Sequence, residues 1–139
     1  MGNTNQKAII TGGAGFIGSH LADRMLSEGY SVLVIDDLSS GSENNLESGI
    51  ELEKISITDK KMHSIIHSFS PTVVFHCAAQ ISVSISTREP ARDAEINLLG
   101  SINLLEGIKN INSGPVKFVF LSTGGAMYGE PSVLPVPEN

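Results

Sequence analysis

A glycine-rich segment running from Gly12 to Gly18 contains the residues whose types and spacing point most clearly to a chemistry. Gly13, Gly15 and Gly18 form a G-x-G-x-x-G pattern, and Gly12 in place of Gly13 gives G-x-x-G-x-x-G. When such a segment turns a strand into a helix, a pyrophosphate can approach its backbone and meet the unpaired N–H groups of the first helical turn. The segment therefore predicts a dinucleotide-binding site.

An acidic residue, Asp36, closes the next apolar run at the distance where dinucleotide-binding domains place a carboxylate on the adenosine ribose. A carboxylate there would accept a hydrogen bond from a ribose 2′-hydroxyl and repel a 2′-phosphate, so the pattern favours NAD over NADP. The polar segment 38–45 should then run over the adenosine end of the cofactor. The alternative is a tight turn that Asp36 merely caps.

Alternating apolar runs and amphipathic stretches predict the elements that would position these residues. We expect strands near 7–11, 31–36, 50–55, 72–77 and 116–121, and helices near 15–28, 59–68 and 91–110. Strands that alternate with helices form a parallel sheet covered on both faces. The prediction is an α/β fold, a Rossmann-like doubly wound parallel sheet of about five strands in the order 3-2-1-4-5.

In the last of these helices, regularly spaced apolar residues mark a stripe that is typical of a long amphipathic helix. The stripe consists of Ile96, Leu99, Ile102, Leu105 and Ile108. Gly100 and Gly107 would let a neighbouring element approach this helix closely.

The composition excludes several classes of protein. A net charge of −6 with only 9 Lys and Arg residues argues against binding to a nucleic-acid backbone. No apolar run is long enough to span a membrane, so we expect neither nucleic acid nor membrane as a partner. The single cysteine, Cys77, excludes an internal disulfide and a cysteine-built zinc site, and it fits a reducing, cytoplasmic setting.

The cysteine and three of the histidines are expected to have no catalytic or metal-binding role. His76, at the end of a predicted strand, is interpreted as packed and hydrogen-bonded rather than catalytic. Cys77 is interpreted as a small buried hydrophobe, because no Cys-His-Asn spacing accompanies it. His63 and His67 lie one helical turn apart, but no third ligand is suggested, so we expect a solvated helix face and no metal site.

Five ordered motifs resemble those of one protein family. They are Thr11 to Gly18, Asp36 to Gly41, His76 to Gln80, Asn97 to Gly100 and Ser122 to Glu130. Together they resemble the N-terminal half of an extended short-chain dehydrogenase/reductase, in the nucleotide-sugar epimerase group of the UDP-galactose 4-epimerase type. The resemblance implies a polar tail at 1–6, an NAD-binding Rossmann domain at 7–122 and an active-site loop segment at 123–139, truncated before the catalytic helix and the substrate domain.

The resemblance also implies NAD as the cofactor and a set of residues around it. The pyrophosphate would be lined by Gly12, Ala14, Gly15, Phe16, Ile17 and Gly18. The adenosine side would be contacted by Asp36, Asp37, Leu38, Ser40 and Gly41, and by Ser56 and Ile57, which stand where the family has an Asp-Ile pair. The segment Cys77, Ala78, Ala79 and Gln80 would receive the nicotinamide side, supported by Asn97 from the long helix. The alternative for Asn97 is a helix residue that bonds locally or to solvent.

In this family a tyrosine removes the proton of the sugar 4-hydroxyl, NAD accepts the C4 hydride, and the 4-keto sugar turns over before the hydride returns. A lysine lowers the pKa of that tyrosine, and both residues belong to a Tyr-x-x-x-Lys motif. This chain has no such motif, because Val34 and Ser132 stand four residues after Tyr30 and Tyr128. The chain alone is therefore expected to be inactive.

The family's Ser or Thr that bonds to the sugar 4-oxygen is replaced here by Gly124. Thr123 is the first candidate to supply a catalytic hydroxyl in its place, and Ser122 is the second. Successive side chains of an extended segment point to opposite faces, so only one of the two hydroxyls can face a given ligand.

The resemblance favours the NAD-binding portion of a nucleotide-sugar epimerase that interconverts UDP-glucose-type sugars at C4, in a parent enzyme that dimerises through the helix at 91–110. The partner would be a nucleotide sugar, most simply a UDP-sugar. One alternative is an NAD-binding or sensing module without turnover. Another is a related NDP-sugar dehydratase, decarboxylase or reductase, although the 4,6-dehydratases carry Thr-Asp-Glu where this chain has Gly124 to Ala126.

Overall fold

The computed structural model describes residues 6–111, 114–123 and 127–137. Its strands form one five-stranded sheet in the order β3-β2-β1-β4-β5, and every adjacent pair is parallel. The strands are β1 (Lys7–Thr11), β2 (Ser31–Ile35), β3 (Glu51–Glu53), β4 (Val73–His76) and β5 (Lys117–Phe120). The predicted strand order 3-2-1-4-5 is confirmed.

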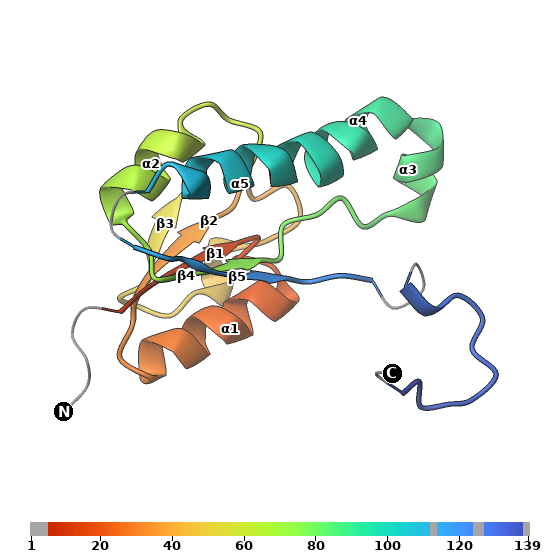
Figure 1. The fold of residues 1–139 in the computed structure, drawn as a ribbon, viewed down its shortest axis with the longest axis horizontal. Helices are drawn as coiled ribbons and strands as arrows, with labels where there is room; N and C mark the ends of the chain where they lie inside the picture. Colours follow the sequence, from red (N-terminus) through yellow and green to blue (C-terminus); the bar gives the residue numbers. More distant parts are fainter. Residues whose placement is uncertain (1–5, 112–113, 124–126, 138–139) are drawn as a thin grey trace.

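Helices cover both faces of this sheet. The elements are α1 (Phe16–Ser27), the 3₁₀ turn η1 (Glu43–Asn45), α2 (Met62–Phe69), α3 (Val83–Arg88), α4 (Pro90–Ala94), the π-helical segment η2 (Glu95–Gly100) and α5 (Ser101–Lys109). Figure 1 shows α1 on one face and α2, α4 and α5 on the other. The doubly wound architecture is therefore confirmed, while the short helix α3 was not predicted.

The strands contribute alternate residues to two hydrophobic cores. Ile9, Leu33 and Val74 belong to a core that also contains buried residues of α2 and α5, whereas Ile10 and Val34 belong to a second core with Ala22 of α1. Successive side chains of a strand point to opposite faces, so a strand buried on both sides is apolar throughout. This explains why β1 and β2 read as continuous apolar runs.

Two glycines bring the last helical stretch close to its neighbours. A Cβ placed on Gly100 would lie 2.6 Å from Cδ1 of Ile57, and one placed on Gly107 would lie 2.8 Å from Cδ1 of Ile66 on α2. Both distances are too short for a real side chain, so the predicted close approach at Gly100 and Gly107 is confirmed.

The predicted apolar stripe is divided between two environments. Ile96 and Ile108 pack against the core, whereas Leu99, Ile102 and Leu105 are 57%, 44% and 45% exposed. The fully buried apolar residue of α5 is instead Leu104. The prediction of one stripe assumed an uninterrupted period of about 3.6 residues, which the wider turns of η2 change.

Beyond β5, the described residues 127–137 run away from the sheet (Figure 1). The expected polar tail at 1–6 lies outside the described residues except for Gln6, whose carbonyl accepts a hydrogen bond from Ser31 N–H at 3.0 Å. In the part of the chain that the structure describes, none of the helices has the length and apolar character needed to cross a bilayer.

Candidate dinucleotide-binding site

The corner between β1 and α1 is built on close contacts that only glycine permits. Gly12 has φ +67°, a left-handed conformation, and its N–H donates to the carbonyl of Ile35 at 2.8 Å. A Cβ at Gly12 would lie 2.6 Å from the backbone nitrogen of Ala78. The corner after β1 is therefore in direct backbone contact with the end of β4.

The start of α1 packs closely against the corner that follows β1. A Cβ on Gly18 would lie only 2.2 Å from the carbonyl oxygen of Gly12, and one on Gly13 would lie 2.6 Å from the side chain of Val34. The N-cap of α1 is Gly15, and no side chain caps this end of the helix. The first-turn N–H groups of a helix have no partner within it, so α1 directs uncapped donors to the corner. We name residues 12–18 the glycine cradle.

Asp36 joins the glycine cradle to the loop after β2. Its Oδ2 accepts a hydrogen bond from Ala14 N–H at 2.9 Å, and its Oδ1 accepts one from Leu38 N–H at 2.8 Å. Leu38 has φ 59°, which is unusual for a residue other than glycine. A carboxylate oxygen has two acceptor positions, so each oxygen retains one that could face a ribose hydroxyl. Asp36 thus caps the turn, as the alternative interpretation expects, without losing the capacity to bind ribose.

The loop from Leu38 to Asn45 packs directly on the glycine cradle. The carbonyl of Ala14 accepts hydrogen bonds from Ser42 N–H at 3.1 Å and from Asn45 Nδ2 at 2.8 Å. A Cβ on Gly41 would lie 2.8 Å from that same carbonyl oxygen. The loop is therefore held against the cradle by specific contacts, and Asn45 was not singled out in the sequence because its partner lies 31 residues away.

The loop after β4 is held by Asn97 from the π-helical segment η2. Asn97 Oδ1 accepts from Gln80 N–H at 2.8 Å, and Asn97 Nδ2 donates to the Gln80 carbonyl at 3.0 Å. The side-chain amide of Asn97 thus bonds to both the N–H and the carbonyl of Gln80, as a residue of a neighbouring strand would. Asn97 therefore fixes the path of the chain where it leaves β4 past Ala78 and Ala79.

A buried hydrogen-bonded chain connects β1, β4 and α5 beneath this loop. The hydroxyl of Ser101 donates to the Asn97 carbonyl at 2.7 Å, so His76 Nε2 donates to Ser101 Oγ at 2.9 Å. The other ring nitrogen, Nδ1, then accepts from the Thr11 hydroxyl at 2.6 Å. Burial lowers the pKa of His76 to about 4 from its ordinary 6.5, which matches a neutral ring with its proton on Nε2.

Comparisons with known proteins agree with this geometry. Residues 8–139 match the model of the NAD dependent epimerase/dehydratase family. The chain belongs to this family.

Among the relatives, the chain is 41% identical over 138 residues to the UDP-glucose 4-epimerase of Mycolicibacterium smegmatis, covering 96% of this chain and 44% of that protein. Among solved structures, it is similar to the UDP-glucose 4-epimerase of Thermotoga maritima with UDP-glucose, at 49% identity and a TM-score of 0.85, covering 96% of this chain and 43% of that one. The Thermus thermophilus UDP-glucose 4-epimerase in complex with NAD has 42% identity and a TM-score of 0.83, covering 96% and 41%. This member of the epimerase/dehydratase family thus spans less than half the length of those relatives.

The residues expected at the cofactor follow the carboxyl ends of neighbouring strands in this family member. The glycine cradle follows β1, Asp36 to Gly41 follow β2, Ser56 and Ile57 follow β3, and Cys77 to Gln80 follow β4. In a parallel sheet these ends share one edge, where ligands of doubly wound folds bind. The sheet therefore gathers the expected residues along a single edge.

Ser56 and Ile57 make contacts within the protein. Ser56 Oγ accepts from Thr58 N–H at 3.3 Å, and the Ile57 side chain is buried in the core. The carbonyl of Ile57 accepts from Asn103 Nδ2 at 2.8 Å. Whether this pair also contacts adenine stays a prediction.

The thiol and the two hydroxyls have different surroundings. Cys77 is half-buried, and burial raises the pKa of its thiol to about 11, so a thiolate is disfavoured at neutral pH. Ser122 and Thr123 follow β5 and are exposed. Gly124, the expected site of the missing hydroxyl, lies outside the described residues. The catalytic roles of Thr123 and Ser122 stay predictions.

The expected solvated face with His63 and His67 is wrong for His63. His63 Nε2 forms a hydrogen bond with the Asn103 carbonyl at 3.0 Å, and His63 lies under Gly107 at the contact of α2 with α5. The reason is that glycine at 107 leaves room for an imidazole that would otherwise point to solvent. His67 is exposed, and within the described ranges no group of at least three His, Cys, Asp or Glu residues could hold a metal.

The neutral state of His76 predicts a pH dependence of stability. The pKa of His76 is about 4 in the folded protein against 6.5 ordinarily, so the unfolded chain binds the proton more readily between these values. The contribution of His76 is therefore complete above pH 6.5 and is lost as the pH falls toward 4. We expect urea unfolding to show a loss of about 2 kcal/mol between pH 7 and pH 5 that His76→Gln lacks. Equal losses in both proteins would contradict this assignment.

Proposed function

We propose that this chain is the NAD-binding portion of a nucleotide-sugar epimerase that interconverts UDP-glucose-type sugars at C4. The observation that carries the proposal is the glycine cradle closed by Asp36, because it combines a glycine-rich backbone at the uncapped start of α1 with a carboxylate suited to an unphosphorylated ribose. Membership of the family and similarity to UDP-glucose 4-epimerases supply the reaction class.

The described residues fit NAD in two respects. The cradle would hold the pyrophosphate, since Gly12 and Gly18 let the backbone of the corner pack closely against the start of α1 and since α1 begins without a capping side chain. Asp36 and the loop against Ala14 would hold the adenosine side. When bound, NAD supplies an acceptor for a hydride. The chain's own contribution is to bind and orient that acceptor at the edge of the sheet.

The hydroxyls after β5 are the part of this chain that we propose to face the sugar. Thr123 comes first and Ser122 second, as exposed groups that follow the strand next to β4. A hydroxyl there would orient the sugar 4-oxygen by a hydrogen bond. Neither hydroxyl is a sufficient base, because an ordinary alcohol needs an adjacent base to lose its proton. The proposed reaction therefore requires residues beyond those present here.

The direct test is a chimera of this chain with the C-terminal part of the Thermotoga maritima UDP-glucose 4-epimerase, joined at the position matching Asn139. We expect conversion of UDP-glucose to UDP-galactose, because the two N-terminal portions are 49% identical with a TM-score of 0.85. Thr123→Val should reduce the turnover number more than Ser122→Ala does. A folded chimera that binds NAD without turnover would instead support an NAD-binding or sensing module.

We further propose that the parent enzyme forms a homodimer through the helical stretch 91–110. Leu98, Leu99, Ile102 and Leu105 are exposed along this stretch, and clustered exposed apolar side chains favour association. Sedimentation of this chain should show concentration-dependent association that Ile102→Glu removes. Lys109→Glu, a charge change near the end of α5, is the control and should leave association unchanged. A monomer at all concentrations would contradict this proposal.

A further inference from the structure

Asp93 lies outside the residues that the family resemblance implies, yet it is the acceptor shared by several polar groups around the β4 loop. Asp93 Oδ1 accepts from Gln80 Nε2 at 2.8 Å and from Asn97 Nδ2 at 3.2 Å. It also accepts from the hydroxyl of Ser86 on α3. We name Gln80, Ser86, Asp93 and Asn97 the Asp93 cluster. One carboxylate oxygen thus ties together the β4 loop, α3 and the π-helical segment.

The helical stretch itself presents Asp93 and Asn97 to the same loop. The two residues are four apart, Asp93 in α4 and Asn97 in η2, and residues at this spacing lie on one side of a helix. π-helical turns are rare and occur frequently at functional sites. Asn97 uses both of its N–H donors, since Nδ2 donates to Asp93 as well as to Gln80, and its Oδ1 accepts from Gln80 N–H.

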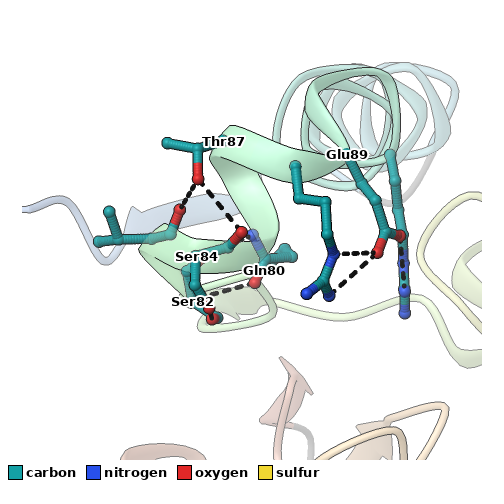
Figure 2. A network of polar contacts seen from close by, with 8 residues as sticks. Gln80, Ser82, Ser84, Thr87 and Glu89 are labelled. Atoms are coloured by element: carbon teal, nitrogen blue, oxygen red, sulfur yellow. Dashed lines mark hydrogen bonds and ion pairs between the residues drawn. The ribbon is translucent and has the colours of Figure 1, made fainter.

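The side chain of Gln80 is committed to the protein rather than free to meet a ligand. Its Nε2 donates to Asp93 and to the Ser82 carbonyl at 3.1 Å, and its Oε1 accepts from Ser82 N–H at 2.6 Å. Figure 2 shows Gln80 and Ser82 together at the start of α3, with Ser84 and Thr87 further along that helix. The Gln80 side chain therefore links the β4 loop to α4 through Asp93. The adjacent residue Ala79 is exposed.

The charge on Asp93 is stabilised by these contacts. Hydrogen bonds from Ser86 and Gln80 lower the pKa of Asp93, with a smaller contribution from Asn97. Hydrogen bonds to an ionised acceptor are shorter and stronger than those between neutral groups. An asparagine at this position keeps one acceptor oxygen but carries no charge, so it should weaken all three hydrogen bonds of the cluster without changing the shape of the side chain.

The topology indicates which half of a dinucleotide this cluster would affect. β1 lies between β2 and β4, and Asp36 follows β2 while the Asp93 cluster holds the loop after β4. A dinucleotide whose pyrophosphate lies on the glycine cradle after β1 would therefore have its adenosine half near Asp36 and its other half at the β4 loop.

We propose that Asp93 is a positioning residue for the nicotinamide half of the cofactor. It fixes Gln80 and Asn97, and through them the backbone of Ala78 and Ala79, in the arrangement that receives the nicotinamide ring. This inference rests on the proposed function, since it requires that NAD binds at the cradle.

The experiment compares NAD with ADP-ribose, which lacks the nicotinamide ring, by calorimetric titration of the whole chain. Asp93→Asn should weaken NAD binding about tenfold while changing ADP-ribose binding less than about twofold. Ser86→Ala removes one donor without altering Asp93 and should weaken NAD binding to a smaller extent. Asp59→Asn is the control, because the Asp59 carboxylate accepts a local hydrogen bond from Lys61 N–H, and it should change neither affinity.

The outcomes separate this inference from the proposed function. Equal losses for NAD and ADP-ribose in Asp93→Asn would show a general structural role and overturn the positioning role. Unchanged binding of both ligands in Asp93→Asn and in Ser86→Ala would overturn it as well. If the unaltered chain bound neither ligand, the proposed function itself would fail and the inference with it. Should Asp93→Asn not fold, Ser86→Ala alone decides, through the same comparison of the two ligands.

Discussion

Gly18→Ala is expected to abolish measurable NAD binding and to lower the free energy of unfolding by about 2–3 kcal/mol. The added Cβ would lie 2.2 Å from the carbonyl oxygen of Gly12 and 2.7 Å from the Cα of Gly13. Both are backbone atoms, so the contact can be relieved only by moving α1 away from the corner after β1. That movement opens the cradle and displaces the first-turn N–H groups. Calorimetric titration and urea unfolding measure the two effects.

Gly29→Ala is the matched control for this prediction. Gly29 has φ +85°, so alanine is strained there, but nothing lies within 4 Å of the added Cβ. Strain of this kind costs about 1 kcal/mol, and it lies at the far end of α1 from the cradle. We expect a modest loss of stability with unchanged NAD affinity. If Gly18→Ala kept the affinity of the unaltered chain, the cradle could not be the pyrophosphate site.

Asp36→Asn is expected to reduce NAD affinity about tenfold and to remove most of the preference for NAD over NADP. The carboxylate accepts from Ala14 N–H and Leu38 N–H, and an amide can accept with only one of its two ends. The neutral amide would also no longer repel a 2′-phosphate. Parallel titrations with NAD and NADP would measure both effects. The affinity for NAD should fall, and the ratio of the NAD affinity to the NADP affinity should become smaller.

Asp59→Asn serves as the control for Asp36→Asn. Asp59 Oδ1 accepts from Lys61 N–H at 2.8 Å, two residues on, which repeats the contact of Asp36 with Leu38 in a turn that follows β3. We expect Asp59→Asn to leave the affinities for NAD and for NADP unchanged. An unaltered preference for NAD in Asp36→Asn would assign selectivity to a group other than this carboxylate.

The sequence alone was sufficient for the strand order and for the general place of the cradle. Both depend on local signals, namely apolar runs, glycine spacing and an acidic residue closing a strand. Asp36 could be identified because its position relative to the glycines is set by one strand-helix-strand unit. Within such a unit, the number of residues between the glycines and the acidic residue determines where the two lie relative to each other in the fold.

The Asp93 cluster and the environment of His63 could not be predicted in this way. Asp93 contacts Gln80, which is 13 residues away, and His63 contacts Asn103, which is 40 residues away. Neither contact leaves a local pattern. The spacing of Asp93 and Asn97 places them on one helix face, but residues four apart are common in helices. The spacing therefore does not predict which residues elsewhere in the chain these two contact.

The π-helical segment escaped prediction for a different reason. Apolar spacing from Ile96 to Ile108 fits an ordinary helix, and nothing local marks the wider turn at Glu95–Gly100. The wider turn accommodates two contacts with other parts of the protein. Asn97 faces the β4 loop, and Gly100 packs on Ile57. Tertiary contacts of this kind override the local period.

The most direct test of the central claim is calorimetric titration of the unaltered chain with NAD and with NADP under identical conditions. The claim is that the glycine cradle receives a pyrophosphate while Asp36 accepts the hydroxyl of an unphosphorylated ribose. It predicts saturable binding of one NAD per chain, at least about tenfold tighter than NADP. Absence of NAD binding by the folded chain, or tighter binding of NADP, would contradict it.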